Sequence, residues 1–257
     1  DSLIKVCYNY VQSKEKKSDP ELLPIYLQMI SYYLLIEEEF VKAEILMQRA
    51  TDIINQYYSQ DHYYAGLLYN YKCFVKYDEG DYENALNYGR LAAEIFEKYP
   101  SYLSSNEKSC LMLASIYLWY YKDYTRALEY CRIITNNQVS TSSSICYANY
   151  LIGLSELRMG NIAKGKQILL GILQKGEPED ASTARTFIYC YLDLSNLSFS
   201  SNTKLTFYYL KKASDLAYKF NIKAEIAKIH LKIASVYYYL ENDYENALME
   251  YQESIIA

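Results

Sequence analysis

The sequence predicts an all-α fold, a right-handed superhelix of about six helical hairpins. Three observations predict it. The hexapeptide DYENAL occurs at 81–86 and again at 243–248, with the near copy DYTRAL at 123–128. Around each copy, apolar residues recur with the spacing of one helix face. Glycine and proline are scarce, at 8 and 4 of 257 residues, whereas sheet proteins need frequent turns.

The alanines of these copies define a repeat of about 40 residues. Ala85 and Ala127 are 42 residues apart, and Ala247 follows 120 residues later, which is three steps of 40. Small residues at these positions allow a second helix to approach closely. Weaker copies place equivalent anchors at Leu3, Ala43, Gly165 and Thr206.

Each anchor lies in a second helix, and an apolar stretch before most anchors predicts a first helix. These first helices are expected over 23–36, 65–77, 109–121, 145–159 and 226–240. The polar turns EGDY, YKDY, MGNI and ENDY join the two helices, because Asp, Asn and Gly cap helices and tolerate turn geometry. A lone hairpin cannot bury its apolar face, so we expect about thirteen helices stacked into an array.

Several of these segments resemble tetratricopeptide repeats. The matching stretches are YLIGLSELRMGNIAKG, LASIYLWYYKDYTRALEY, IASVYYYLENDYENALMEY and CFVKYDEGDYENALNY. In that family a small residue begins the second helix and an aromatic residue precedes it in the turn. The repeat of about 40 residues is longer than the usual 34. The resemblance covers roughly residues 3–254 and implies the superhelical fold of the tetratricopeptide regions found in bacterial regulators.

The repeat continues to both ends, so we expect one array over residues 1–257. The sequence begins within a second helix and ends within another, with Ile255 and Ile256 at the tip. Helical arrays normally close with a polar capping helix. We therefore expect this array to be part of a longer protein.

The charge balance argues against two classes of partner. The formal net charge is −5, with no basic bias to neutralise phosphates, so we expect no nucleic-acid binding. No run of 18 apolar residues exists, so we expect no membrane span in this region. The compartment stays open: cytoplasmic, or periplasmic if a signal peptide has been removed.

No motif indicates catalysis, a cofactor or a metal. GNIAKGKQ at 160–167 approaches a phosphate-binding loop, but Gln167 replaces the required hydroxyl and a helix precedes it. His62 and His230 lie far apart in sequence, without the local ligand spacing of a zinc site. The cysteines show no C-x-x-C pair, and we expect them to be reduced core residues. They are Cys7, Cys73, Cys110, Cys131, Cys146 and Cys190.

The resemblance implies a binding surface on the concave face, which the first helix of each pair lines in that family. Amide side chains there can bond a peptide backbone, and aromatic side chains are common interface anchors. Counting back from the anchors gives the expected partner-binding residues: Gln28, Tyr32, Asn70, Phe74, Tyr77, Met112, Trp119, Tyr147 and Tyr150.

Three functions stay open at the level of the sequence. The first is a non-enzymatic module that binds proteins or peptides, as the sensor or scaffold region of a bacterial regulatory protein. The second is a signalling-peptide receptor that resembles the cytoplasmic quorum-sensing repeat proteins. The third is an enzyme with a site between repeats, for which no motif argues.

Overall fold

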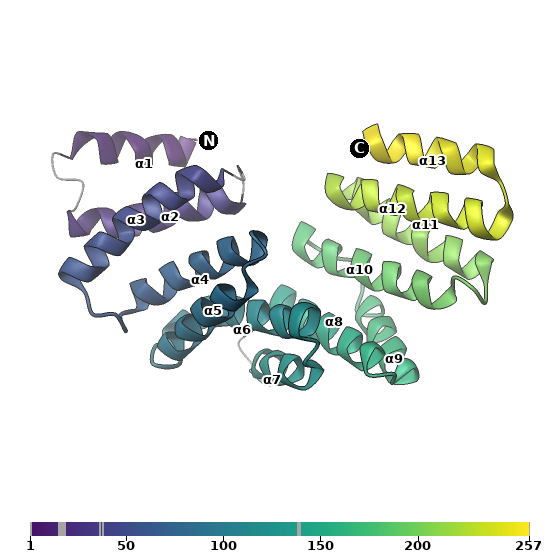
Figure 1. Ribbon diagram of the computed structural model, residues 1–257, viewed down its shortest axis with the longest axis horizontal. Helices are drawn as coiled ribbons and strands as arrows, with labels where there is room; N and C mark the ends of the chain where they lie inside the picture. The colour runs from purple at the N-terminus through teal and green to yellow at the C-terminus, as the bar shows by residue number, and fades with distance from the viewer. Residues whose placement is uncertain (1, 15–18, 36, 38, 138–139, 257) are drawn as a thin grey trace. The chain divides into compact units, whose positions relative to one another are not determined.

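The computed structural model describes residues 2–14, 19–35, 37, 39–137 and 140–256 (Figure 1). Within these residues all regular structure is helical, and consecutive helices pair as hairpins. The predicted fold class, an all-α tetratricopeptide-like array of helical hairpins, is confirmed. The contacts divide the chain into two compact units, Asp1–Ser140 and Thr141–Ala257. The prediction of one continuous array over the whole chain stays a prediction.

The N-terminal unit contains one leading helix and three hairpins. The α6 helix continues into a π-helical turn, and short 3₁₀ turns precede α2 and α6. The helices are α1 (Ser2–Ser13), α2 (Leu23–Leu35) with α3 (Phe40–Tyr57), α4 (Tyr63–Asp78) with α5 (Tyr82–Glu97), and α6 (Leu103–Ile116) with α7 (Tyr124–Thr135).

The C-terminal unit contains three hairpins, which lie side by side in Figure 1. In the last hairpin, the first helix, α12, also continues into a π-helical turn. The helices are α8 (Ser142–Arg158) with α9 (Ile162–Leu173), α10 (Ala181–Ser198) with α11 (Thr203–Lys219), and α12 (Lys223–Val236) with α13 (Tyr244–Ile256).

The repeated Asp of the DY motif caps the N-terminus of the second helix. Asp81 accepts a hydrogen bond from the backbone N–H of Asn84, and Asp123 accepts one from Arg126. These bonds satisfy an otherwise unpaired donor of the first helical turn. The preceding residue, Gly80 or Lys122, has a positive φ of 79° or 54° and reverses the chain.

Two first helices hold one extra residue before this turn. In α6 the backbone N–H of Asp123 bonds to the carbonyl of Tyr117, six residues earlier. In α4 the equivalent bond spans five residues, from Asp81 to Lys76. A π-helical turn absorbs such an insertion without breaking the helix. The other such helix is α12, where the π-helical turn Tyr237–Glu241 absorbs the extra residue. The second DYENAL copy therefore keeps its position at the start of the following helix.

The small residues of the repeat lie where two helices meet. Ala43, Ala85 and Ala127 are fully buried. A Cβ atom at Gly165 would lie 2.6 Å from the Leu157 side chain and 2.7 Å from a backbone oxygen of α8. The helices of a hairpin thus approach more closely than a larger residue would allow.

None of the described helices is both long and apolar enough to cross a membrane.

Candidate functional site

In the C-terminal unit the first helices of successive hairpins, α8, α10 and α12, contact one another directly. Hydrogen bonds from tyrosine hydroxyls and from a lysine bridge these contacts. We call this surface the tyrosine–carboxylate face, and it comprises Tyr147, Tyr150, Tyr189, Asp193, Glu225 and Lys232.

Three tyrosines form a row across α8 and α10. The rings of Tyr147 and Tyr150 stack with centroids 5.9 Å apart, and Tyr150 lies 5.6 Å from Tyr189. Tyr147 and Tyr189 are half-buried, so part of each side chain is accessible. Tyrosines so placed give flat apolar area with a polar edge, which suits an interface.

Asp193 of α10 is the first carboxylate of this face. The Tyr150 hydroxyl donates to Asp193 Oδ2 at 3.0 Å. Burial raises the pKa of Asp193, although the Tyr150 hydrogen bond and the nearby charges of Arg158 and Lys232 act in the opposite direction. The carboxylate is therefore incompletely solvated in the folded protein and would gain from a further donor.

Glu225 of α12 repeats the arrangement one helix further on. Its carboxylate Oε1 accepts from the Tyr189 hydroxyl at 3.2 Å and from Lys228 Nζ at 3.1 Å. Glu225 is only 3% exposed, and its Oε2 atom is buried without a hydrogen-bond partner among the described residues. A buried oxygen without a hydrogen-bond partner lowers the stability of the folded protein by about 1–3 kcal/mol.

Donors also lie on this face. Lys232 Nζ donates to the side-chain oxygen of Asn196 at 2.8 Å, which joins α12 to α10. Burial lowers the pKa of Lys232, while Asp193 raises it. The face thus offers acceptors for N–H groups and an ammonium for a carbonyl or carboxylate. This combination of rings, donors and acceptors suits an extended peptide.

The N-terminal unit uses Asn70 in a different way. The Asn70 amide donates to the backbone oxygen of Ser105 at 3.0 Å and accepts from the Ser109 hydroxyl at 2.6 Å. Both polar groups of this side chain therefore hold α4 against α6.

Of the four other predicted residues on α2 and α4, three contact separate neighbours. Gln28 is exposed on α2, and the Tyr32 hydroxyl donates to Glu37 at 2.5 Å. Phe74 stacks parallel to Phe40 with centroids 6.5 Å apart, and Tyr77 meets Tyr82 edge-on at 5.5 Å.

Met112 and Trp119 complete the predicted set. Met112 is half-buried on α6, and Trp119 is 44% exposed in the π-helical turn that follows α6. Of the nine predicted residues, the structure places Tyr147 and Tyr150 in one row, and Phe74 packs against a core cluster. A role of these nine residues in partner binding stays a prediction.

Sequence reasoning missed Tyr189, Asp193 and Glu225. The fifth hairpin lacks the DY turn, so its first helix, which carries Tyr189 and Asp193, does not stand out as one of the repeating elements. Glu225 lies one residue before the first helix expected over 226–240. One signal is present: Asp193 is the single charge in the otherwise uncharged segment FIYCYLDLSNLS. A lone charge within an apolar helix needs a partner across a helix contact.

The phosphate-loop-like segment and the two histidines have structural roles. The GNIAKGKQ segment begins in the hairpin turn between α8 and α9, where Gly160 has a φ of 87°, and continues into α9 from Ile162 onwards. His62 caps α4 by accepting from the backbone N–H of Tyr64, and His230 hydrogen-bonds to Glu250 at 2.6 Å.

The cysteines are free thiols, and all but Cys7 are buried. Burial raises the pKa of Cys73 and of Cys131 to about 12, so these thiols are protonated and unreactive at neutral pH. In the part of the chain that the structure describes, no three His, Cys, Asp or Glu side chains gather as a metal site would require.

Comparison with known proteins supports the fold. No protein-family model matches the sequence, and no curated protein matches it. Among solved structures, the chain is similar to RapI in its apo form, with a TM-score of 0.60 and 16% sequence identity. The match covers 91% of this chain and 96% of that chain. At this identity the likeness concerns the helical-repeat fold.

Proposed function

We propose that the chain is a protein- or peptide-interaction module, and that the C-terminal unit binds an extended peptide on its tyrosine–carboxylate face. One observation carries the proposal: a tyrosine hydroxyl pairs with a half-buried or buried carboxylate at two successive helix contacts. Tyr150 pairs with Asp193, and Tyr189 pairs with Glu225. A repeated array of this kind matches the repeated backbone of an extended chain.

In this proposal each part of the face has a separate role. Peptide N–H groups donate to the half-buried carboxylate of Asp193. Lys232 donates to a peptide carbonyl, and the rings of Tyr147 and Tyr189 pack against peptide side chains. Such a module would serve as the sensor or scaffold region of a bacterial regulatory protein. The likeness to RapI supports the fold that this proposal needs.

A peptide array tests the proposal even though the natural ligand is unidentified. The probe is a random array of acetylated, amidated octapeptides, incubated with labelled protein. We expect sequence-dependent binding that falls at least tenfold in Tyr189→Ala. The control is Tyr239→Ala, because Tyr239 is 68% exposed in the same unit and outside this face. Equal binding by both variants and the unaltered protein would place the site elsewhere.

A further inference from the structure

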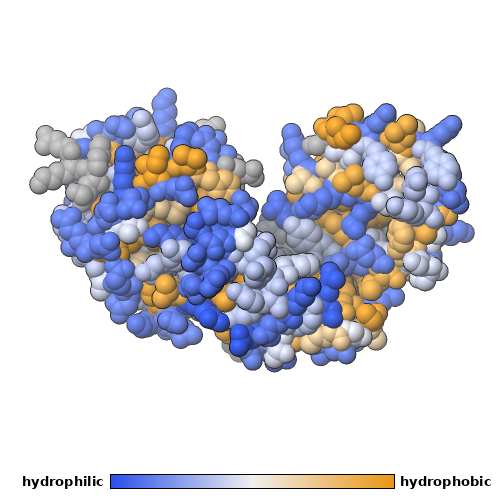
Figure 2. Space-filling view, viewed as in Figure 1, coloured by the Kyte–Doolittle hydropathy of each residue, from blue (hydrophilic) through white to orange (hydrophobic). Residues whose placement is uncertain are grey.

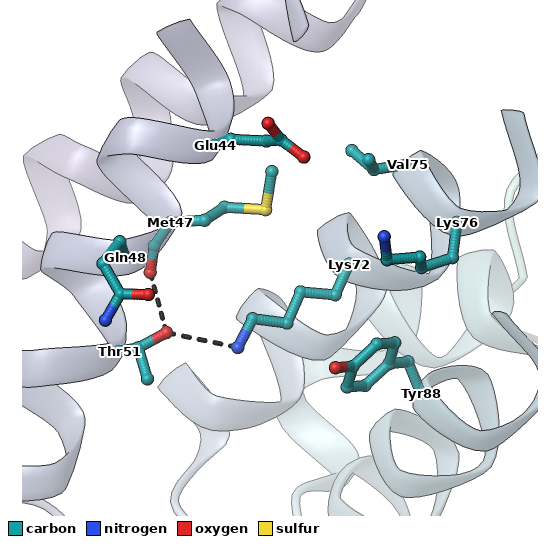
Figure 3. A pocket seen from close by; sticks show the side chains of 8 residues that line it. All are labelled: Glu44, Met47, Gln48, Thr51, Lys72, Val75, Lys76 and Tyr88. Atoms are coloured by element: carbon teal, nitrogen blue, oxygen red, sulfur yellow. Dashed lines mark hydrogen bonds between the residues drawn. The ribbon is translucent and has the colours of Figure 1, made fainter. Parts of the chain in front are cut away.

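A second feature lies in the N-terminal unit and shares no residue with the proposed peptide site. A pocket with a volume of about 290 Å³ opens between α3, α4 and α5 (Figure 3). Met47 and Val75 form its apolar floor, and each is only 4% exposed. The pocket thus has room for a short side chain and a surface against which that chain can bury.

Lys72 reaches into this pocket from α4. Its ammonium donates to the Thr51 hydroxyl at 3.2 Å, and that hydroxyl itself donates to the carbonyl of Met47 at 2.8 Å. The Lys72 ammonium also lies 6.0 Å from the ring centre of Tyr69 and 5.8 Å from that of Tyr88. An ammonium carries three donors, and one hydroxyl accounts for one of them.

No carboxylate of the described residues forms an ion pair with Lys72. Burial alone accounts for the lowered pKa of this side chain, with no neighbouring charge among the causes. A half-buried ammonium of this kind is incompletely stabilised by two rings and one hydroxyl. The site therefore holds an unsatisfied positive charge beside an apolar floor.

The other charges around the pocket limit the ligand to a single negative charge. Lys76 already pairs with Glu79 at 2.6 Å. Glu44 also lines the pocket, and Figure 3 shows its carboxylate far from the Lys72 ammonium and on the side of Val75. A dianion such as phosphate would meet repulsion from Glu44, whereas a monoanion can bind at Lys72 and stay away from it.

We propose that this pocket binds a carboxylate joined to a short apolar group, with the carboxylate on Lys72 and the apolar group on Met47 and Val75. Two sources present this chemistry: a small carboxylic acid and the C-terminal residue of a peptide. Tyr88 covers the side of the bound group, and Thr51 keeps the ammonium in place. The proposal is independent of the peptide site on the C-terminal unit.

Calorimetric titration of the intact chain tests the charge requirement. The probes are N-acetyl-leucine, its neutral amide and acetyl-Gly-Gly-Leu with a free C-terminus. We expect saturable binding of at least one acid, no measurable binding of the amide, and at least tenfold weaker binding by Lys72→Met. The control Lys108→Met changes an exposed lysine on α6 and should bind as the unaltered protein does.

A second measurement needs no variant. In the unaltered protein, the bound acid should protect Lys72 from acetylation by acetic anhydride, measured by mass spectrometry, while Lys108 stays equally reactive. Binding of both acids indicates a small-acid site, and binding of the peptide alone indicates a C-terminal residue. Equal binding of acid and amide, competition by inorganic phosphate at equal concentration, absence of binding, or full binding by a folded Lys72→Met protein would each overturn the proposal.

Discussion

At the scale of single residues, Gly165 shows how closely two helices of a hairpin approach. A Cβ atom there would lie 2.6 Å from the Leu157 side chain and 2.7 Å from the Gly153 carbonyl oxygen. Distances this short require the backbones of α8 and α9 to separate. Gly171 lies in the same helix, and a Cβ atom added there would meet no neighbouring atom within 4 Å, so it provides a matched control.

We predict opposite effects of the same substitution at these two glycines. Gly165→Ala should destabilise the protein by about 1–3 kcal/mol, because it overpacks the hairpin. Gly171→Ala should be neutral or stabilise by up to about 1 kcal/mol, because alanine favours a helix over glycine. Urea denaturation of both variants measures the difference. Equal stability would mean that α8 and α9 are not in close contact at Gly165.

Overpacking at the repeated alanine should have a similar cost. Ala85 is fully buried between helices, so Ala85→Leu should lower stability by about 1–3 kcal/mol. Ala163 is exposed on α9, and Ala163→Leu should leave stability within about 0.5 kcal/mol of the unaltered protein. Thermal melts of the two variants make the comparison. A stable Ala85→Leu protein would contradict the repeat register.

At the scale of elements, the hairpin turns depend on charged caps. The side-chain and backbone hydrogen bonds of Asn84 hold the pKa of Asp81 below its ordinary value of 3.8, and those of Asn246 do the same for Asp243. A carboxylate whose pKa is lowered in the folded state stabilises the folded protein, and this stabilisation is complete at pH values above the ordinary pKa. That contribution is lost as pH falls through the folded pKa.

The caps therefore predict an acid-sensitive part of the stability. The variant Asp81→Asn/Asp243→Asn keeps a capping oxygen but cannot titrate. At pH 7 it should melt below the unaltered protein, and the gap should narrow as pH falls from about 5 to 3. Melting temperatures across this range test the prediction. A gap that stays constant with pH would show that the cap charge does not contribute.

The hairpins could be predicted from the sequence because their signals are local and periodic. The DY turns, the small anchors and the helical spacing each lie within a few residues of one another. The tyrosine–carboxylate face could not be predicted in this way. Tyr150 and Asp193 are 43 residues apart, and their contact depends on which helices become neighbours. The π-helical turns after α6 and α12 are marked in the sequence only by one extra residue before the DY turn.

At the scale of the molecule, each compact unit has its own apolar core. In the C-terminal unit, buried residues of α10, α11 and α12 form one cluster, which includes Ile188, Leu210 and Ile229. The last helix, α13, exposes the apolar side chains of Leu248, Met249, Ile255 and Ile256. Figure 2 shows hydrophobic surface in the region of this helix.

We predict that residues 141–257 fold without the preceding unit. Their three hairpins stack on one another, and a helical array depends mainly on contacts between neighbours. The separately expressed segment should give a helical circular-dichroism spectrum and a cooperative thermal transition. A spectrum of an unfolded chain would show that its stability requires residues 1–140.

The most direct test of the proposed peptide site is the affinity of Asp193→Asn for an octapeptide selected on the array. Burial raises the pKa of Asp193, so a neutral amide should leave the melting temperature unchanged or raise it. Peptide affinity should nevertheless fall at least tenfold, or about 1.4 kcal/mol, because the carboxylate acceptor is lost. Asp215→Asn, an exposed change on α11, is the control. A folded Asp193→Asn protein that binds the peptide with full affinity would contradict the proposed function.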